Sequence, residues 1–259
     1  CLKMISGLST PTEGEIEIFG YKGRELEQMR SRIGCLIEAP GLYENMTAYE
    51  NLKTKCLFCG IHKKGYIEDI LDTVGLGDTG KKQTKHFSLG MKQRLGIGLA
   101  LVGEPDLLVL DEPINGLDPQ GIAEVRDTLH RLQQERNMTI LISSHILEEL
   151  SKIATDYGII HDGTLLQELT KEELMRRCSE RIEITLDMPE RAIPVLDRLG
   201  FTQYQVTDKI HIQVYERLNE SAGLNMELTK AGIPVRGITI TSEELESYYL
   251  NLTGGASNV

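Results

Sequence analysis

Two adjacent carboxylates, Asp111 and Glu112, stand directly after a run of aliphatic residues, Leu107 to Leu110. The run is short and lies between Pro105 and Pro113, which is typical of a buried strand in a parallel sheet. Open α/β sheets carry their chemistry just beyond the carboxyl ends of their strands, so we expect the two acids to lie at such an edge. Adjacent side chains at a strand end point in different directions. One acid can therefore hold a metal ion, usually through water, while the other faces a water molecule placed to attack phosphorus.

Three further groups of polar residues occupy comparable positions. Glu38 follows a predicted strand over residues 32–37, and a second predicted buried strand, from Thr139, ends in the polar residues that lead to His145. Ser88 is a natural N-cap for a helix, and the free N–H groups at a helix start can bind an anion. Taken alone, the segment at Ser88 is better explained as an ordinary capped amphipathic helix.

Alternation, periodicity and turn residues predict the elements that position these groups. Thr47 and Glu50 form a capping box at the start of a helical region over residues 45–85. Other helices are predicted at residues 1–8, 120–136 and 146–153, an edge strand at 15–20, and a hairpin around 162–163. From residue 181 to 241 the pattern is β-α-β-β-α-β, with strands at 201–206 and 234–241, as in the ferredoxin-like unit, and a helix follows at 243–252.

The totals limit the class of protein. The chain has 259 residues, with 28 Lys and Arg against 39 Asp and Glu, for a net charge of -11. This balance disfavours a large nucleic-acid interface, which needs a basic face. The five cysteines are an odd number and indicate reduced thiols, and we interpret Cys56 and Cys59 as two half-buried thiols on one helix. No stretch is long and apolar enough to span a bilayer, and no signal peptide is recognisable.

In their order and spacing, the four polar groups closely resemble those of the nucleotide-binding subunit of an ABC transporter. The resemblance covers about residues 1 to 165. Residues 87–91, Phe-Ser-Leu-Gly-Met, resemble the family signature, which is usually Leu-Ser-Gly-Gly-Gln. The Asp111-Glu112 pair resembles the Walker B motif, Gly116-Leu117-Asp118 the D-loop, and His145 the switch histidine.

The resemblance implies an α/β fold with a P-loop NTPase-like core, made of a mostly parallel sheet and a helical subdomain at about residues 45–100. It implies ATP and Mg²⁺ as cofactors. Asp111 is then expected to bind Mg²⁺ through water, Glu112 to act as general base toward the attacking water, and His145 to reach the γ-phosphate. We expect an ATPase domain over residues 1–168 and a small α+β ferredoxin-like accessory domain over 169–259.

The same resemblance implies partners. The family closes two subunits head to tail over two ATP molecules, so Ser88 and Gly90 are expected to contact the nucleotide of the opposite subunit. The resemblance also implies that Glu38 and Asp118 belong to the nucleotide-binding residues. Integral membrane permease subunits are expected as further partners, at the cytoplasmic face of the membrane. The residues expected to receive a permease helix are Tyr43, Met46 and Tyr49, for which ordinary packing is an equally good explanation.

Two departures from the family pattern stand out. Glu38 occupies a position where the family normally has Gln, and the acidic variant resembles the branch that exports bacitracin-type and lantibiotic peptides. Because Glu can still bind Mg²⁺, we expect altered coupling and no loss of function. In the signature, Leu89 and Met91 replace a glycine and a glutamine, while Ser88 and Gly90 are kept.

The phosphate-binding loop Gly-x4-Gly-Lys-Ser/Thr is expected immediately before Cys1. A near-match at residues 75–82 lacks the metal-binding hydroxyl residue and follows a predicted helix, so we do not interpret it as that loop. The chain also begins in what resembles the middle of a helix. We therefore expect an N-terminally truncated chain that hydrolyses ATP only at full length.

Three hypotheses of function follow. The first is the ATPase subunit of an exporter of a peptide antibiotic or other drug. The second is a soluble ABC-type ATPase acting on nucleic acid or ribosomes, which the acidic balance and the single set of motifs disfavour. The third is a non-enzymatic binder, which the presence of both Glu112 and His145 disfavours. In the C-terminal region His211 has no second ligand nearby in the sequence, so we expect it to be a packing or solvated residue.

Overall fold

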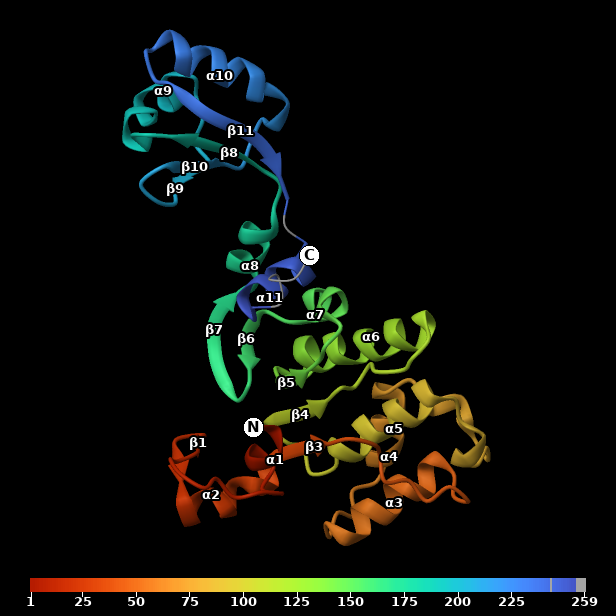
Figure 1. Cartoon of the computed structure of the whole chain (residues 1–259). Helices are drawn as coiled ribbons and strands as arrows, with labels where there is room; N and C mark the ends of the chain where they lie inside the picture. The colour runs from red at the N-terminus through yellow and green to blue at the C-terminus, as the bar shows by residue number, and fades with distance from the viewer. Residues whose placement is uncertain (243, 255–259) are drawn as a thin grey trace. The chain divides into compact units, whose positions relative to one another are not determined.

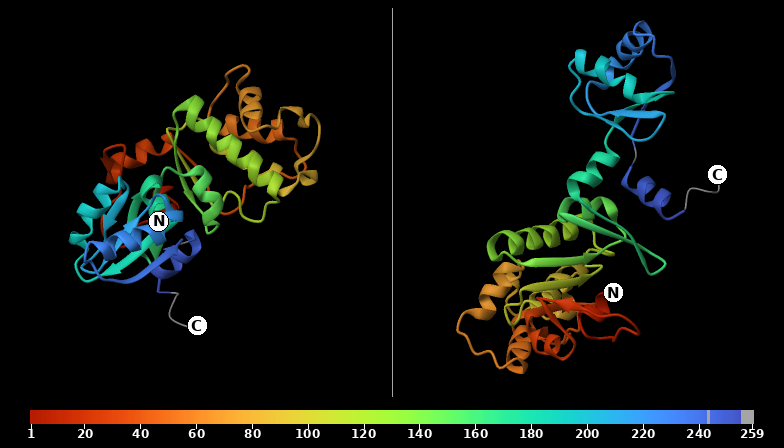
Figure 2. Two further views of the ribbon diagram at one scale, coloured as in Figure 1. Left: turned by 90° about the horizontal axis from the view of Figure 1, so that it is seen from above. Right: turned by 90° about the vertical axis from the view of Figure 1, so that its left-hand side faces the viewer.

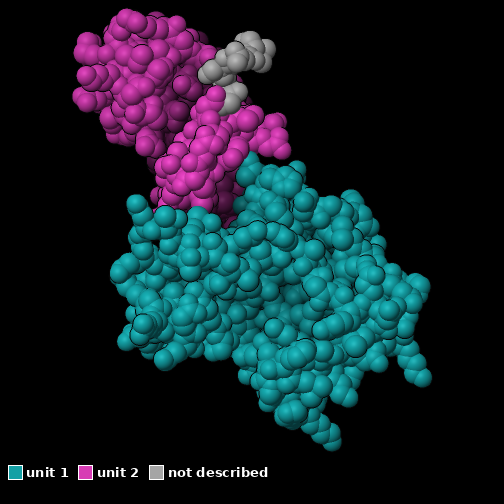
Figure 3. All heavy atoms as spheres, turned by 60° about the horizontal axis from the view of Figure 1, so that its bottom comes forward, with its two compact units in different colours: residues 1–153 teal, residues 154–259 magenta. Residues whose placement is uncertain are grey.

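The computed structural model describes residues 1–242 and 244–254. The chain divides into two compact units, Cys1–Ile153 and Ala154–Val259 (Figure 3). This division falls earlier than the boundary expected between residues 168 and 169. The hairpin that follows Ile153 groups with the second unit, because its second strand leads straight into Thr170, the N-cap of the next helix.

The first unit is built around a small parallel sheet (Figure 1). Its strands are β3 (Ile33–Leu36), β4 (Leu107–Asp111) and β5 (Thr139–Ser143), in the order β3-β4-β5. Both pairs are parallel, and the register places Leu36 opposite Leu110 and Asp111 opposite Ser143. Because all three strands point the same way, their polar carboxyl ends meet at one edge, as the sequence predicted.

Seven helices accompany this sheet in the described part of the first unit: α1 (Leu2–Ile5), α2 (Gly23–Met29), α3 (Ala48–Phe58), α4 (Tyr66–Thr73), α5 (Leu89–Ala100), α6 (Pro119–Arg136) and α7 (Leu147–Ile153). Short 3-10 turns occur at Arg30–Arg32, Gly77–Thr79 and Thr84–His86. The predicted capping box is present at α3, where the Thr47 hydroxyl accepts from the Glu50 N–H at 3.2 Å and the Glu50 carboxylate accepts from the Thr47 N–H at 2.8 Å. Helices α3 and α4, drawn in orange, lie together and away from the N-terminal segment, drawn in red (Figure 2).

The core of this unit joins the sheet to α5 and α6. Leu108 and Leu110 of β4 are fully buried. They belong to one hydrophobic cluster with residues of the surrounding helices, among them Leu52, Ile70, Leu95, Ile97, Val125, Leu129 and Leu132. Burying such side chains supplies the main driving force for folding, and here it also fixes the strand that carries the two acids.

The N-terminal region is less regular than the sequence predicted. The expected helix over residues 1–8 is reduced to α1, and the expected edge strand over 15–20 is a two-residue strand, β1 (Glu17–Ile18), paired with β2 (Tyr21–Lys22). The turn between these strands passes through Phe19 and Gly20, both with positive φ. This tight turn ends the alternating pattern before a longer strand can form.

The second unit begins with an antiparallel hairpin of β6 (Asp156–His161) and β7 (Thr164–Thr170), which confirms the predicted turn at Asp162 and Gly163. Helix α8 (Lys171–Cys178) follows. Next comes a four-stranded antiparallel sheet in the order β11-β8-β10-β9. Its strands are β8 (Arg181–Leu186), β9 (Tyr204–Val206), β10 (His211–Val214) and β11 (Val235–Thr241).

Helices α9 (Ile193–Arg198) and α10 (Ser221–Lys230) lie on one face of that sheet (Figure 2). Short 3-10 turns at Pro189–Arg191 and Leu218–Glu220 precede them. The strand order and connections are those of the ferredoxin-like unit, which confirms the prediction. Helix α11 (Leu245–Leu252) is the last helix among the described residues, and the predicted helix start at residue 243 lies outside them.

Strand β9 is shorter than the predicted strand over residues 201–206. The backbone N–H groups of Thr202 and Gln203 donate to the carboxylate of Glu216 instead of to a neighbouring strand. A side-chain acceptor from a distant part of the sequence therefore replaces strand pairing at these two positions.

In the part of the chain that the structure describes, no helix is both long and apolar enough to cross a lipid bilayer.

Candidate active site

A serine on β5 holds the acid pair of β4 in place. The hydroxyl of Ser143 donates a hydrogen bond of 2.6 Å to Oδ1 of Asp111. The same hydroxyl accepts one of 3.1 Å from the backbone N–H of Glu112, which also lies 3.2 Å from the Ser143 carbonyl. A hydroxyl has one proton to donate and lone pairs to accept with, so Ser143 uses both capacities on the two acids. The orientation of Asp111 is thereby tied to the neighbouring strand.

The backbone turns sharply at Glu112, where φ is 50°. This left-handed conformation costs a non-glycine residue on the order of 1 kcal/mol, and such strain is concentrated at functional sites. The turn brings the Glu112 carboxylate to His145, whose Nδ1 lies 2.9 Å from Oε2. An ionised carboxylate only accepts, so Nδ1 carries the proton in this contact. The structure thus brings together the two residues for which catalytic roles were predicted.

Glu38 follows β3 at the same edge of the sheet and also has a positive φ, 64°. Its carboxylate accepts a hydrogen bond of 2.6 Å from Nζ of Lys3 in α1. This bond and the charge of Glu38 raise the pKa of Lys3, and the charge of Asp111 adds to the effect. Both partners are more than half exposed, so the ion pair itself adds little stability. The raised pKa of Lys3 nevertheless shows that this cation lies close enough to Glu38 and Asp111 to interact with both charges.

Sequence reasoning missed two residues of this site. Ser143 lies at the polar end of the predicted strand from Thr139, and the sequence analysis assigned it no role. Two adjacent strands that both end in polar residues are the signal that could have paired it with Asp111. Lys3 had no such signal. Its contact with Glu38 joins positions 35 residues apart, and nothing local in the sequence marks it.

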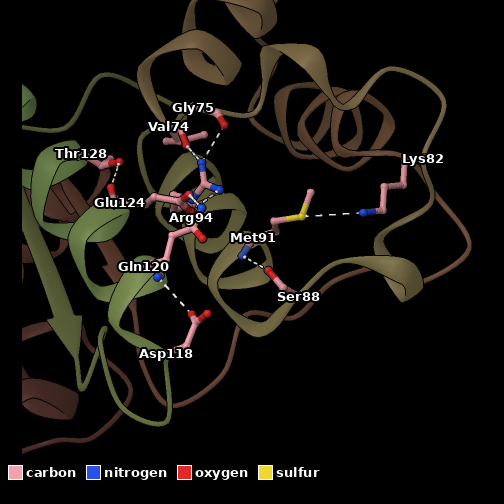
Figure 4. Close-up of polar contacts among 11 residues, drawn as sticks. Val74, Gly75, Lys82, Ser88, Met91, Arg94, Asp118, Gln120, Glu124 and Thr128 are labelled. Atoms are coloured by element: carbon pink, nitrogen blue, oxygen red, sulfur yellow. Dashed lines mark hydrogen bonds and ion pairs between the residues drawn. The ribbon is translucent and has the colours of Figure 1, made fainter.

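The remaining predicted residues form a second group at the starts of α5 and α6 (Figure 4). The Ser88 hydroxyl accepts from the Met91 N–H at 3.2 Å and is the N-cap of α5. The Asp118 carboxylate accepts from the Gly121 N–H at 3.0 Å and is the N-cap of α6. Both side chains therefore have a capping function. Their contact with a nucleotide remains a prediction, as does that of Gly90, which is buried.

The near-match to a phosphate-binding loop has a different structural context. Residues 75–82 follow α4 and include the 3-10 turn Gly77–Thr79, so they do not connect a strand to a helix. The carbonyl of Gly75 accepts a hydrogen bond from Arg94. Both observations agree with the interpretation that this segment is no phosphate cradle.

Of the two cysteines at the end of α3, Cys56 is buried and Cys59 is exposed.

The oxygen atoms at the sheet edge are of the kind that a magnesium ion takes as ligands. Asp111 and Glu38 provide carboxylates there, beside the hydroxyl of Ser143. Within residues 1–242 and 244–254, no group of three or more His, Cys, Asp or Glu side chains is arranged to hold a metal. Mg²⁺ needs no such cage, because it is typically held by one or two carboxylates together with water and substrate phosphates. The residues present therefore fit Mg²⁺ bound with a nucleotide.

Comparison with known proteins decides the family. The sequence model of the ABC transporter family matches residues 1–115. The bacitracin transport ATP-binding protein BcrA of Bacillus licheniformis is 43% identical over 260 residues, covering 99% of this chain and 84% of that protein. The chain belongs to the ABC transporter family of ATP-binding proteins.

Other members of the family support this assignment. BcrA of Enterococcus faecalis is 39% identical over 98% of this chain and 83% of its own length. The lantibiotic transport ATP-binding protein SrtF of Streptococcus pyogenes is 45% identical over 64% of this chain and 71% of its own length. A solved ATP-binding subunit of an ABC transporter, 31% identical, aligns with a TM-score of 0.56 over 68% of this chain and 74% of that one.

A dimeric ATP-binding cassette bound to ADP and Pi shares the fold, with a TM-score of 0.57 at 24% identity over 66% of this chain and 78% of that chain. Together with the parallel sheet, these likenesses confirm the predicted fold class, an α/β ABC ATPase core of the P-loop NTPase type. Membership of the family also confirms the prediction of an ABC-type ATPase that binds ATP.

Proposed function

We propose that this ABC ATPase powers the export of a peptide antibiotic of the bacitracin or lantibiotic type through membrane subunits that are separate chains. The observation that carries the proposal is the extent of the likeness to the bacitracin transport protein of B. licheniformis. At 43% identity it runs over 99% of the chain, and so includes the ferredoxin-like unit as well as the ATPase unit. A soluble ATPase acting on nucleic acid is a weaker hypothesis for a chain with a net charge of -11.

In this proposal Glu112 is the general base that orients and activates the attacking water. Its strained backbone and its bond to His145 hold the carboxylate in one direction. His145 donates to Glu112 from Nδ1, so it can donate to a phosphate from Nε2 only when the ring is doubly protonated. A hydrogen-bond donor beside the γ-phosphate suits a reaction that depends on positioning and charge stabilisation.

Asp111 and Glu38 are the proposed magnesium residues, Asp111 acting through water. When bound, Mg²⁺ neutralises negative charge on the phosphates. Ser143 keeps the Asp111 carboxylate facing the site, because its hydroxyl occupies Oδ1 at 2.6 Å. Glu38 has its own cation, Lys3, which offsets the additional negative charge that replaces the usual glutamine of the family.

We further propose that two subunits close head to tail, with Ser88 and Gly90 of one subunit, next to Asp118, facing the nucleotide of the other. The N–H groups at the start of α5 provide an anion site for that contact. The permease subunits are proposed to dock near α3, where Tyr43 is 52% and Tyr49 is 39% exposed and Met46 lies between them in the sequence. The protein then works at the cytoplasmic face of the membrane as a peripheral subunit.

Bacterial resistance tests the proposal. The full-length protein is expressed with its membrane subunits in a sensitive strain, and the minimal inhibitory concentrations of bacitracin and of a lantibiotic are measured. We expect an increase for at least one of the two with the wild-type protein and none with Glu112→Gln at equal expression. The proposal of substrate class is wrong if neither concentration rises although the complex hydrolyses ATP in isolated membranes.

A further inference from the structure

One buried arginine connects three helices beside the second group of site residues. Arg94 of α5 is only 8% exposed. Its Nη1 atom donates to the carbonyls of Val74 at 2.9 Å and of Gly75 at 2.6 Å, at the end of α4. Its Nη2 atom lies 2.9 Å from Oε2 of Glu124 in α6 (Figure 4). A single guanidinium therefore joins α4, α5 and α6.

The chemistry of this contact depends on arginine. A buried cation is tolerated only when it is paired and hydrogen-bonded, and here the carbonyls at the negative end of α4 and the Glu124 carboxylate supply both. The planar fork of arginine reaches acceptors on two sides at once, whereas a lysine is a single point of charge. The Nε atom of Arg94 is buried without a hydrogen-bond partner among the described residues. The Nη contacts are therefore the polar interactions that keep this side chain in place.

The same two helices touch one turn closer to their starts. A Cβ atom added to Gly90 would lie 3.3 Å from Cα of Gly121, so the backbones of α5 and α6 approach without side chains between them. Arg94 comes four residues after Gly90, and Glu124 three residues after Gly121. Residues at these spacings lie on the same face of a helix. The glycine contact and the ion pair thus form one continuous seam between α5 and α6, defined by Gly90, Gly121, Arg94 and Glu124.

This seam starts next to both capping residues, because Ser88 precedes Gly90 and Asp118 precedes Gly121 by less than one turn. We propose that the Arg94–Glu124 pair is a positioning link that fixes Ser88 relative to Asp118, and thereby sets how readily two subunits close over ATP. The inference rests on the proposed function, since it takes Ser88 and Asp118 to face the nucleotide across the dimer. Arg94 and Glu124 themselves touch no substrate and are positioning residues.

Loss of the Arg94–Glu124 pair should affect closure of the dimer without affecting ATP binding by the single subunit, whereas a general structural defect would change both. Each capped turn is held by its own hydrogen bond, so each survives loss of the pair. What is lost is their relative placement. Closure of the dimer should therefore require more ATP, while a single subunit should still bind ATP with its usual affinity.

The experiment uses the full-length protein carrying Glu112→Gln, so that closed dimers persist. Dimer formation is followed by sedimentation across a range of ATP concentrations, and ATP binding by the single subunit is measured with a fluorescent ATP analogue at high dilution. Adding Glu124→Ala should raise the ATP concentration for half-maximal dimerisation about tenfold, which corresponds to about 1.4 kcal/mol. Arg94→Lys should shift it in the same direction, because it keeps the charge and loses the fork.

Arg131→Ala is the matched control. Arg131 also extends from α6 to the end of α4, where its Nη1 lies 3.3 Å from the Asp72 carbonyl, but its ion pair, with Glu135, stays within α6. It should leave the ATP concentration for dimerisation unchanged. Glu124→Gln, which retains a hydrogen-bond acceptor, should shift it less than Glu124→Ala.

The outcomes distinguish the two levels of the proposal. If Glu112→Gln alone forms no dimer with ATP, the proposed function is wrong. If it forms the dimer and Glu124→Ala leaves the half-maximal ATP concentration unchanged, the positioning link is wrong. The link is also wrong if Glu124→Ala weakens ATP binding by the single subunit to the same degree, since that would indicate a general structural defect.

Discussion

The side chain of Glu112 owes its direction to its own backbone and to two neighbours. A φ of 50° turns the chain directly after β4, the backbone N–H is bound by Ser143, and the carboxylate is bound by His145. An isolated glutamate at a strand end would sample several rotamers. Here the contacts that limit this freedom come from β5 and the segment after it. The direction of the Glu112 carboxylate therefore depends on residues more than thirty positions away.

Replacing Ser143 tests this dependence. Ser143→Ala removes the hydrogen bond to Asp111 and one acceptor of the Glu112 N–H, each worth about 1 kcal/mol. We expect the ATPase kcat of the full-length protein to fall about tenfold, with a change in melting temperature of only a few degrees. Ser143→Thr keeps the hydroxyl and should retain most of the activity. Equal activity of Ser143→Ala and wild type would show that Asp111 needs no such support.

Local signals predicted several of the residues that the structure brings together at the sheet edge, whereas long-range contacts were predicted poorly. Asp111, Glu112 and His145 were recognisable because strand endings and neighbouring residue types are local in sequence. The pair of Lys3 and Glu38 was not, because an ion pair between distant segments leaves no local pattern. The contacts of Arg94 with α4 and α6 could not be predicted for the same reason. Arg94 resembles any charged residue in an amphipathic helix until α4 and α6 surround it.

At the scale of elements, caps and turns explain which predictions were confirmed. The expected helix caps are present at Thr47 and Ser88, and the expected hairpin turn is present at Asp162-Gly163. Each of these features depends on residues within four positions of one another. The strand expected over residues 201–206 is half that length, because Glu216 captures two of its N–H groups. The alternation of residues 201–206 cannot reveal that a carboxylate more than ten positions later accepts the hydrogen bonds that strand pairing would use.

The Glu216 contact also predicts a pH dependence for the ferredoxin-like unit. Hydrogen bonds from the backbone of Gln203 and Thr202 lower the pKa of Glu216. A carboxylate whose folded pKa is depressed adds stability above its unfolded pKa, and this stability is lost as pH falls through the folded pKa. The free energy of unfolding, measured by urea denaturation, should therefore fall as the solution is acidified below about pH 4.

Glu216→Gln provides the comparison, because glutamine has nearly the same shape and no titration. Its unfolding free energy should be lower than that of the wild type at neutral pH, and the difference between the two should narrow at acid pH. A constant difference across the range would mean that Glu216 makes no charge-dependent contribution. The pKa of Asp208 is also lowered, chiefly by its hydrogen bond with the His211 side chain. Because Asp208 is present in both proteins, its contribution to the unfolding free energy does not affect the comparison.

At the scale of the whole molecule, the residues that the structure describes form two separate hydrophobic clusters. One includes β4, α5 and α6 of the first unit, and the other fills the space between the four-stranded sheet and helices α9 and α10. A unit with a core of its own can fold by itself. Residues 154–259, produced alone, should show a cooperative unfolding transition and dispersed amide signals in NMR spectra. A gradual, non-cooperative transition would indicate that this unit depends on the first.

The account as a whole depends on Glu112 acting on water at a site where ATP is bound. The most direct test is the steady-state rate of ATP hydrolysis by the full-length protein with its membrane subunits, compared with Glu112→Gln. Removal of a general base should lower kcat by roughly 100-fold or more, while ATP binding is retained. A Glu112→Gln enzyme that binds ATP and hydrolyses it at the wild-type rate would contradict the account.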